Sequence, residues 1–492
     1  MKKAFKILSF FFLLTAIGCT SDFDAFEEKA SEYGKSENKI NNEELIDLKA
    51  IVSEFLDQND RAFKRFLTNE SFDEQKLIAY LENKGFKVEK TPIVSAKNVA
   101  INVYIENSGS MNGYINGNTE FKSAIQDMLV LLKYEYEEKN INLFFINSQI
   151  HPINIDTDLT GFASALNAKS FKVGAVASSN LNNVFKQVLS KTSKDTVSIL
   201  ISDCIYSIKG NKTEDLLSDQ KSLTKDAFLT KSKEGMNLTT TVVKLISKFN
   251  GNYWDKNEKA TNLKDEMRPY YISIIGSENI MNHFNSKIIF SEKEVAGYEN
   301  KLVLSSKDYS KGIYFSVVNA KNDFGKFKPS RDFSDKNSIK GIEDIESDSR
   351  SGDKFTFSVA LDLSELPLEK SYITNPKNYT IDEGGFIISK ISEFNKEDLA
   401  SSSVSRISKL GKNPTHYITF SATSNKYSDL KFSLKRQLPK WVEETSTEDD
   451  TNIKSIGNKT FGFKYLMEGI SEAYQTSSPS KNYFEIKIKI NK

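Results

Sequence analysis

Apolar and polar positions follow two alternating patterns between residues 96 and 288. Four apolar runs have the length and composition of buried strands: 98–105 (NVAINVYI), 142–147 (NLFFIN), 196–202 (TVSILIS) and 270–275 (YYISII). Apolar residues at helical spacing predict helices over 120–136, 181–189 and 239–249. Strands that alternate with helices are joined by crossovers. The pattern therefore predicts an α/β domain whose sheet is mainly parallel and covered on both faces.

The pattern changes after about residue 289, where short segments alternate apolar with polar positions. These segments are 312–318, 355–361, 385–389, 417–421, 430–434 and 483–490. Such alternation is typical of antiparallel strands with one wet face, and it predicts an all-β sandwich region over 289–492. Residues 322–354 are polar and charged, so a division into two β subdomains near this stretch is an open alternative.

Two amphipathic helices are predicted nearer the N-terminus. Apolar residues from Leu45 to Leu56 recur at helical spacing, and residues 71–84 repeat this pattern before Gly85. We therefore expect a helical stalk over 42–95, preceded by a polar tether over 19–41.

Residues 1–18 predict an export signal, because three lysines precede an apolar run at 7–14 that is too short to span a bilayer. The sequence AIGC at 16–19 resembles a bacterial lipobox, although Ala16 stands where Leu is usual. The resemblance implies cleavage before Cys19 and a lipid on its thiol, which would anchor the mature chain in a membrane. An export signal without lipidation is the alternative.

Four acidic residues follow Cys19 closely: Asp22, Asp24, Glu27 and Glu28. This acidic run resembles the surface-export signal that follows the lipidated cysteine in some Gram-negative lineages. That interpretation favours an outer-membrane lipoprotein of the cell envelope that faces outward over one that faces the periplasm. A solvated tether is the alternative.

Charge and cysteine content narrow the classes of function. The chain has 67 basic and 66 acidic residues, so its net charge is close to zero and gives no long-range electrostatic attraction of nucleic acid. With Cys19 lipidated, Cys204 is the remaining thiol, so no intramolecular disulfide is expected.

Oxygen-bearing side chains follow the predicted strands at one edge of the sheet. Glu106, Ser108 and Ser110 are spaced two residues apart after the first strand, so their oxygens can converge on one hard cation. Ser179 precedes the helix at 181–189, and Asp203 ends the strand at 196–202. Carboxyl ends of parallel strands share one edge, where such sheets bind ligands.

These residues, over about 97–286, resemble a von Willebrand factor type A domain and its metal-ion-dependent adhesion site. Members of that family have the motif Asp-x-Ser-x-Ser after the first strand, a Thr before a central helix, and an Asp at the end of the fourth strand. Ser108 and Ser110 match the two serines, Asp203 matches the strand-end Asp, and Ser179 or its neighbour Ser178 takes the place of the Thr. Glu106 stands where the family has Asp, and Cys204 where Gly is common.

The resemblance implies a Rossmann-like α/β fold that holds Mg²⁺ or Ca²⁺ with an open position for an acidic side chain of a protein partner. Glu106 carries one methylene more than Asp, which moves its carboxylate outward by roughly 1.5 Å. It therefore either coordinates the ion directly or fills the pocket and prevents binding. In the second case Ser108 and Ser110 only hydrogen-bond the turn.

An enzyme is not expected. A serine nucleophile at 108 or 110 would need a base, yet SGSMNG lacks the Gly-x-Ser-x-Gly elbow, and the chain has only His151, His283 and His416 as imidazole bases.

Residues 207–236 form a long connection after Asp203. This connection either helps to select the binding partner at the carboxyl edge of the sheet or is a helical insertion without a binding role.

A glycan-binding alternative depends on Trp441, which has acidic neighbours from Glu443 to Asp450. An aromatic ring near acids can stack on a sugar, with the acids bonding the sugar hydroxyls, or the ring can simply pack on the β region.

Taken together, these features predict a membrane-anchored lipoprotein that serves in adhesion or assembly by binding a protein. A surface lipoprotein that handles polysaccharide is the second hypothesis.

Overall fold

The computed structural model describes residues 22–34, 38–57, 60–68, 71–88, 99–154, 159–177, 179–208, 212–310, 312–334, 338–383, 385–409, 414–422 and 428–491. Cys19, with the predicted export signal, and Ser178 lie outside these residues. The chain divides into two compact units, Met1–Ile93 and Val94–Lys492, which are described separately. No helix in the described ranges is long and apolar enough to cross a membrane.

The first unit is a small helical body with its own core. Its elements are α1 (Asp22–Tyr33), β1 (Lys39–Ile40), α2 (Asn42–Asp57), β2 (Leu67–Thr68), β3 (Ser71–Phe72), α3 (Glu74–Asn83) and β4 (Lys87–Val88). Asp73 caps α3 by accepting hydrogen bonds from the N–H groups of Gln75 and Lys76. Helices α2 and α3 occupy the two stretches where the apolar spacing predicts them.

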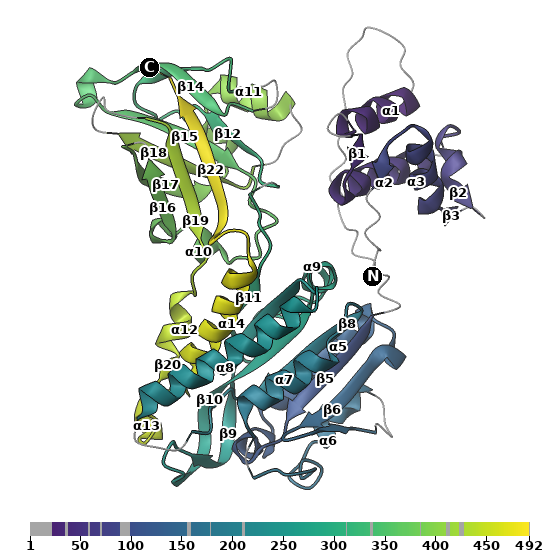
Figure 1. Ribbon diagram of the computed structural model, residues 1–492, viewed down its shortest axis with the longest axis vertical. Helices are drawn as coiled ribbons and strands as arrows, with labels where there is room; N and C mark the ends of the chain where they lie inside the picture. The colour runs from purple at the N-terminus through teal and green to yellow at the C-terminus, as the bar shows by residue number, and fades with distance from the viewer. Residues whose placement is uncertain are drawn as a thin grey trace. The chain divides into compact units, whose positions relative to one another are not determined.

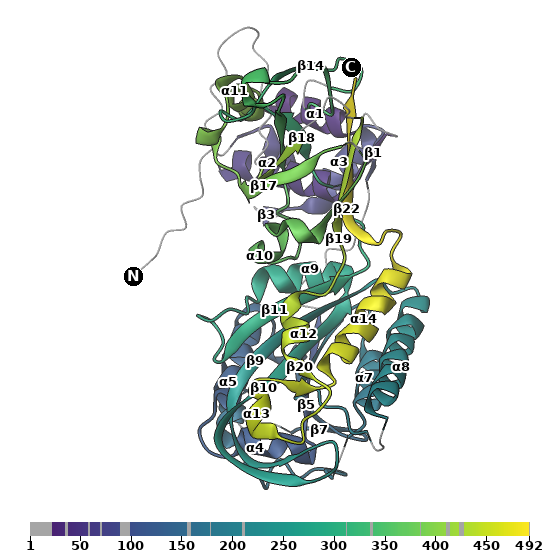
Figure 2. The ribbon, with the colours of Figure 1, turned by 90° about the vertical axis from the view of Figure 1, so that its left-hand side faces the viewer.

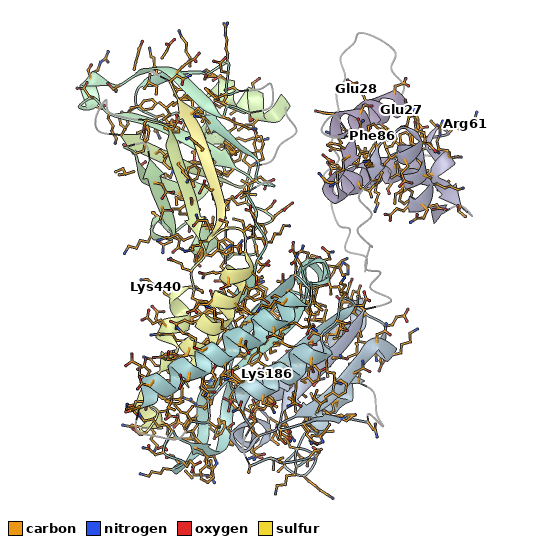
Figure 3. All side chains as sticks on the ribbon, viewed as in Figure 1. Glu27, Glu28, Arg61, Phe86, Lys186 and Lys440 are labelled. Carbon is orange, nitrogen blue, oxygen red and sulfur yellow. The ribbon has the colours of Figure 1, made fainter. Side chains whose placement is uncertain are left out.

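Helix α1 lies in the stretch expected to be a tether. Phe23 and Phe26 are buried in a cluster of aromatic residues, and the Phe26 ring meets that of Phe63 edge-on at 5.6 Å. The acidic residues Glu27 and Glu28 therefore lie on a packed helix (Figure 3). Glu27 accepts a hydrogen bond from Tyr80 and pairs with Lys84 at 2.8 Å. Phe23 and Phe26 are about one helical turn apart, and this spacing is the feature of the polar stretch that indicates a helix with one buried face.

A seven-stranded sheet organises the second unit (Figure 1). Its order is β11 (Tyr298–Ser305), β9 (Leu238–Trp254), β10 (Ala260–Ser277), β8 (Thr196–Ser202), β5 (Ala100–Glu106), β6 (Ile141–Ile146) and β7 (Ile150–Pro152). Strands β8, β5 and β6 run parallel, whereas the pairings on either side of these three are antiparallel. The prediction of a mixed α/β class is confirmed, but the mainly parallel sheet is wrong, because parallel pairing is confined to the centre.

Residues 239–249, predicted as a helix, belong to strand β9. The run Thr239–Thr240–Thr241–Val242–Val243 consists of β-branched side chains, which lose rotamer freedom in a helix and pack well in a strand. The strand is buried over most of its length, so apolar residues stand on both of its faces and imitate helical spacing.

Helices cover both faces of this sheet. Strand β5 alternates, so that Val103 and Ile105 enter one core while Tyr104 enters the other. The first core contains α5 (Glu120–Glu135) and α9 (Glu278–Lys287). The second contains α7 (Leu181–Lys191), α8 (Thr213–Lys233) and α14 (Phe463–Ser477).

Parts of the region predicted as all-β belong to this α/β body. Strand β11 is in the large sheet, and α14 lies beside α8 (Figure 2). Lys221 on α8 pairs with Glu472 on α14 at 3.1 Å. Short elements precede α14: α12 (Lys440–Glu444), β20 (Ser446–Thr447), α13 (Ile453–Ile456) and β21 (Thr460–Phe461).

Two further sheets share one hydrophobic cluster. The first has the order β12 (Phe315–Val318), β15 (Phe355–Leu361), β18 (His416–Ala422) and β17 (Ile387–Glu393). The second has the order β13 (Lys326–Pro329), β14 (Gly341–Glu346), β22 (Asn482–Ile490), β19 (Leu430–Lys435) and β16 (Tyr379–Glu383). Phe420 on β18 meets Phe432 on β19 with ring centroids 4.9 Å apart, which joins the two sheets. The polar stretch 322–354 supplies β13 and β14.

Candidate functional site

Strands β5 and β8 end side by side at the carboxyl edge of the large sheet. They pair in parallel with Ile105 opposite Ile201, so the next residues, Glu106 and Ser202, are neighbours. After Glu106 the chain leaves the strand and turns through a short 3-10 segment at Gly109–Met111. This turn brings the hydroxyl oxygens of Ser108 and Ser110 to 3.0 Å from each other. The structure thus brings together the serine pair that the spacing predicts.

Glu106 is buried, and both of its carboxylate oxygens accept hydrogen bonds from serine hydroxyls. Ser179 donates to Oε1, and Ser202 donates to Oε2. The loop before α7 holds Ser179 in place, because Asn180 caps that helix by accepting from the N–H of Asn183 at 2.9 Å. A hydroxyl that gives its proton to a carboxylate keeps its oxygen lone pairs for another partner, such as a cation.

Ser202 is a site residue that the sequence prediction missed. Its hydroxyl donates to Glu106 and accepts from the N–H of Cys204 at 2.9 Å. The signal that identifies it is its position directly before Asp203, at the end of a strand that neighbours β5.

Asp203 is only 2% exposed, and its two oxygens differ. Oδ1 accepts from the N–H of Ile205 at 3.2 Å, while Oδ2 has no hydrogen-bond partner among the described residues. Burial and the negative charge of Glu106 raise the pKa of Asp203 to about 7, against smaller opposing effects of the Ser110 hydroxyl, the Ile205 N–H and Arg268. A buried carboxyl oxygen without a partner is costly, and a bound cation would satisfy it.

Cys204 has a positive φ of 55°, in the left-handed region that glycine adopts most easily. The buried thiol packs in the core, and burial raises its pKa well above the ordinary value, so it remains protonated.

A hollow of about 880 Å³ opens at this edge of the sheet, and Glu106, Ser108, Ser110 and Ser179 line it, whereas Asp203 is buried and is not part of the lining. The β9–β10 hairpin forms one wall. Ser202 ends β8 opposite Tyr271, and β10 extends from there to Ala260, past the end of β8. The tip of the hairpin contributes residues from Gly251 to Asn262 to the lining. The sequence prediction missed this wall because it treated part of β9 as a helix.

The segment before α14 braces the hairpin. Asp450 accepts hydrogen bonds from the Tyr253 hydroxyl at 2.7 Å and from the N–H of Lys256 at 2.9 Å. The buried guanidinium of Arg268 donates to the carbonyl oxygens of Gly457 at 2.6 Å and Lys459 at 2.8 Å. The hairpin is thus fixed to the body at both of its strands.

The long connection after Asp203 contributes to the site only at its start. Ser207 and Ile208 line the hollow, whereas residues 213–233 form α8, which packs on α7 and α14. Residues 209–211 lie outside the described residues. The structure therefore favours helical decoration for most of this connection.

The histidines and Trp441 lie away from the hollow. His151 contacts Asn147 at 3.3 Å, His283 contacts Glu135 at 3.4 Å, and no histidine is part of the lining. The Trp441 ring stacks on the Phe463 ring, with the two ring centroids 6.0 Å apart. It lines a second cavity of about 310 Å³.

A metal ion at the hollow would depend on serine oxygens. Within the described ranges, no three His, Cys, Asp or Glu side chains are grouped closely enough to hold an ion. The donors available are the hydroxyls of Ser108 and Ser110 and the carboxylate of Asp203, with Glu106 and Ser179 beside them. Hydroxyl and carboxylate oxygens suit Mg²⁺ and Ca²⁺ better than softer metals.

Comparison with models of protein families, with curated proteins and with solved structures gives no match to this chain.

Proposed function

We propose that this chain is a bacterial lipoprotein of the cell envelope that binds another protein through a von Willebrand factor type A-like domain. A divalent cation, Mg²⁺ or Ca²⁺, would lie at the ends of β5 and β8. The observation that supports this most directly is Asp203, whose buried Oδ2 has no hydrogen-bond partner among the described residues, while the hydroxyl of Ser110, one of the serine pair, acts on the same carboxyl group.

In this proposal Ser108, Ser110 and Asp203 hold the ion, and Glu106 orients Ser179 without touching the ion itself. The two hydroxyl donors on Glu106 favour this role, because each carboxylate oxygen already has a partner. A coordination position open toward the hollow would take a carboxylate of the partner protein. The result is ion-dependent adhesion or assembly without catalysis.

A lipid on Cys19 would anchor the chain in the outer membrane, with its body facing outward. The two β sheets that share one cluster would form a β-sandwich that accompanies the binding domain.

Capture of partners from solubilised membranes tests this function. The full-length protein is used as bait with Mg²⁺ and Ca²⁺ present and, in parallel, with chelator. We expect a partner that is retained with the ions and lost with chelator or with the Ser108→Ala, Ser110→Ala variant.

The matched control is Ser190→Ala with Ser222→Ala, which removes two exposed hydroxyls that bond only carbonyls of their own helices. If neither chelator nor the Ser108→Ala, Ser110→Ala variant changes the set of captured proteins, ion-dependent binding is contradicted.

The second cavity supports a different candidate, recognition of a glycan. Trp441, Tyr372 and Tyr483 line it together with the amide side chains of Asn375 and Gln437, a mixture suited to sugar rings and hydroxyls. Against this candidate, the acids near Trp441 do not form an open array, because Asp450 is turned to Tyr253 and Glu448 accepts from Tyr465.

A carbohydrate array separates the two candidates. Glycan binding predicts retention that Trp441→Ala abolishes and that chelator does not change. Trp441→Phe keeps an aromatic ring to stack on Phe463 and serves as the control for folding. An array without signal for the wild-type protein rules this candidate out.

A further inference from the structure

The hollow above the proposed cation site has an acidic wall. At the hairpin tip, Asp255 and Glu258 line it, and Lys256 is the one basic residue of the lining among the residues that the structure describes. The ammonium group of Lys256 lies 3.4 Å from a carboxylate oxygen of Asp449 and donates to the carbonyl oxygen of Glu448 at 3.3 Å. Its charge is therefore already compensated. A ligand that carried only negative charge would approach the cation against this wall.

An aromatic ring stands on the same wall. Trp254 lines the hollow and is 48% exposed, although large aromatic side chains are usually covered. An indole face in a lining that also contains carboxylates suits a Lys or Arg side chain, which gains a cation–π contact and the attraction of the negative charge of the wall. The wall and the floor of the hollow thus favour ligand groups of opposite charge.

The size of the hollow restricts the form of the ligand. About 880 Å³ is within the range of pockets that enclose small molecules, and it admits a few side chains. The hairpin and the segment that braces it stand around the floor, so a flat protein face would not reach Ser108 and Ser110.

We infer that the hollow binds a protruding segment of mixed charge, in which one carboxylate meets the cation and a neighbouring Lys or Arg lies on Trp254 near Asp255 and Glu258. This inference rests on the proposed function, because the carboxylate needs the ion.

Short synthetic peptides on an array test it with the full-length protein in the presence of Mg²⁺. The peptides share a Gly/Ser background and carry one Asp, one Arg, both at varied spacing, or neither. We expect the peptides with both charges to be retained about tenfold more than the Asp peptides, the gain from one desolvated cation–π contact. Equal retention of the Asp peptides, or no retention of any peptide, would overturn the inference.

Variants separate this inference from the proposed function. Trp254→Ala with Glu258→Gln should reduce the mixed peptides to the level of the Asp peptides and leave the heat of Mg²⁺ binding unchanged. Ser108→Ala with Ser110→Ala should abolish both peptide binding and that heat. Tyr134→Ala is the matched control, since Tyr134 is 92% exposed on α5 outside the hollow, and it should change neither.

If Trp254→Ala with Glu258→Gln leaves the retention of mixed peptides unchanged while Ser108→Ala with Ser110→Ala abolishes it, the inference fails and the cation site stands. If chelator leaves mixed-peptide binding intact, the cation site fails, and with it the carboxylate half of the inference.

Discussion

Asp203→Asn removes a buried carboxyl group whose charge the folded protein disfavours when no cation is bound. Its pKa is about 7 in the folded protein against an ordinary 3.8, so the folded state binds more protons between these values. Stability must then fall as pH rises through this window, by the linkage between proton binding and folding. For the wild type without cation, the raised pKa of Asp203 lowers stability, relative to acid pH, by about 4 kcal/mol at about pH 8 and by about 2 kcal/mol at about pH 5. At the lower pH the folded carboxyl stays protonated, and the loss arises because the unfolded chain ionises.

Asparagine has the same shape without the charge, but its amide also lacks a partner, which costs about 1–3 kcal/mol at any pH. In chelator we therefore expect the variant to be more stable than the wild type by about 1–3 kcal/mol at about pH 8. This advantage should shrink by about 2 kcal/mol at about pH 5, and the shrinkage is independent of the amide cost.

Denaturant unfolding followed by tryptophan fluorescence measures this difference. The chain has two tryptophans, Trp254 and Trp441, and both belong to the unit that contains the site. Asp226→Asn on α8 is the matched control, because it makes the same chemical change at an exposed carboxylate outside the hollow. A difference between variant and wild type that does not depend on pH would refute the reasoning.

Three further predictions concern packing and the site. Gly469→Ala should destabilise the second unit by about 1–3 kcal/mol in the same fluorescence assay, since the added Cβ would lie 2.6 Å from a backbone oxygen of α8; Gly161→Ala, with open space around it, should change stability by less than about 0.5 kcal/mol. Phe26→Ala should cost the first unit about 3–5 kcal/mol by circular dichroism and leave the fluorescence transition unchanged, and a shift of that transition would contradict separate cores. Glu106→Gln removes a charge that raises the pKa of Asp203, so the pH-dependent loss of stability should end at a lower pH and be smaller. An unchanged profile would exclude this charge as a cause.

Strands β5, β6 and β8 and helices α5 and α7 occupy the stretches where the apolar pattern predicts them. Each of the two helices turns one apolar face to one core, and the three strands are short apolar runs rich in β-branched or aromatic residues. The pattern is misleading in β9, which is buried on both faces and therefore carries apolar residues at helical and strand spacing alike. Once β9 is a strand, the sheet is mixed.

The candidate site was predictable where residues follow strand ends. Glu106, Ser108, Ser110, Ser179 and Asp203 converge, because β5 and β8 are parallel neighbours and Ser179 precedes the helix between β6 and β8.

The walls of the hollow were not predictable in the same way. They come from a hairpin that extends past the sheet and from the segment around Asp450, far away in the sequence. No local pattern reports that contact, since tertiary packing alone brings the two together.

A calorimetric titration with Mg²⁺, Mn²⁺ and Ca²⁺ tests the cation site most directly. We predict saturable heat for the wild-type protein with at least one of these ions, and none for Asp203→Asn or for Ser108→Ala with Ser110→Ala. Absence of heat from the wild type at millimolar ion, or equal heat from these variants, would contradict the account.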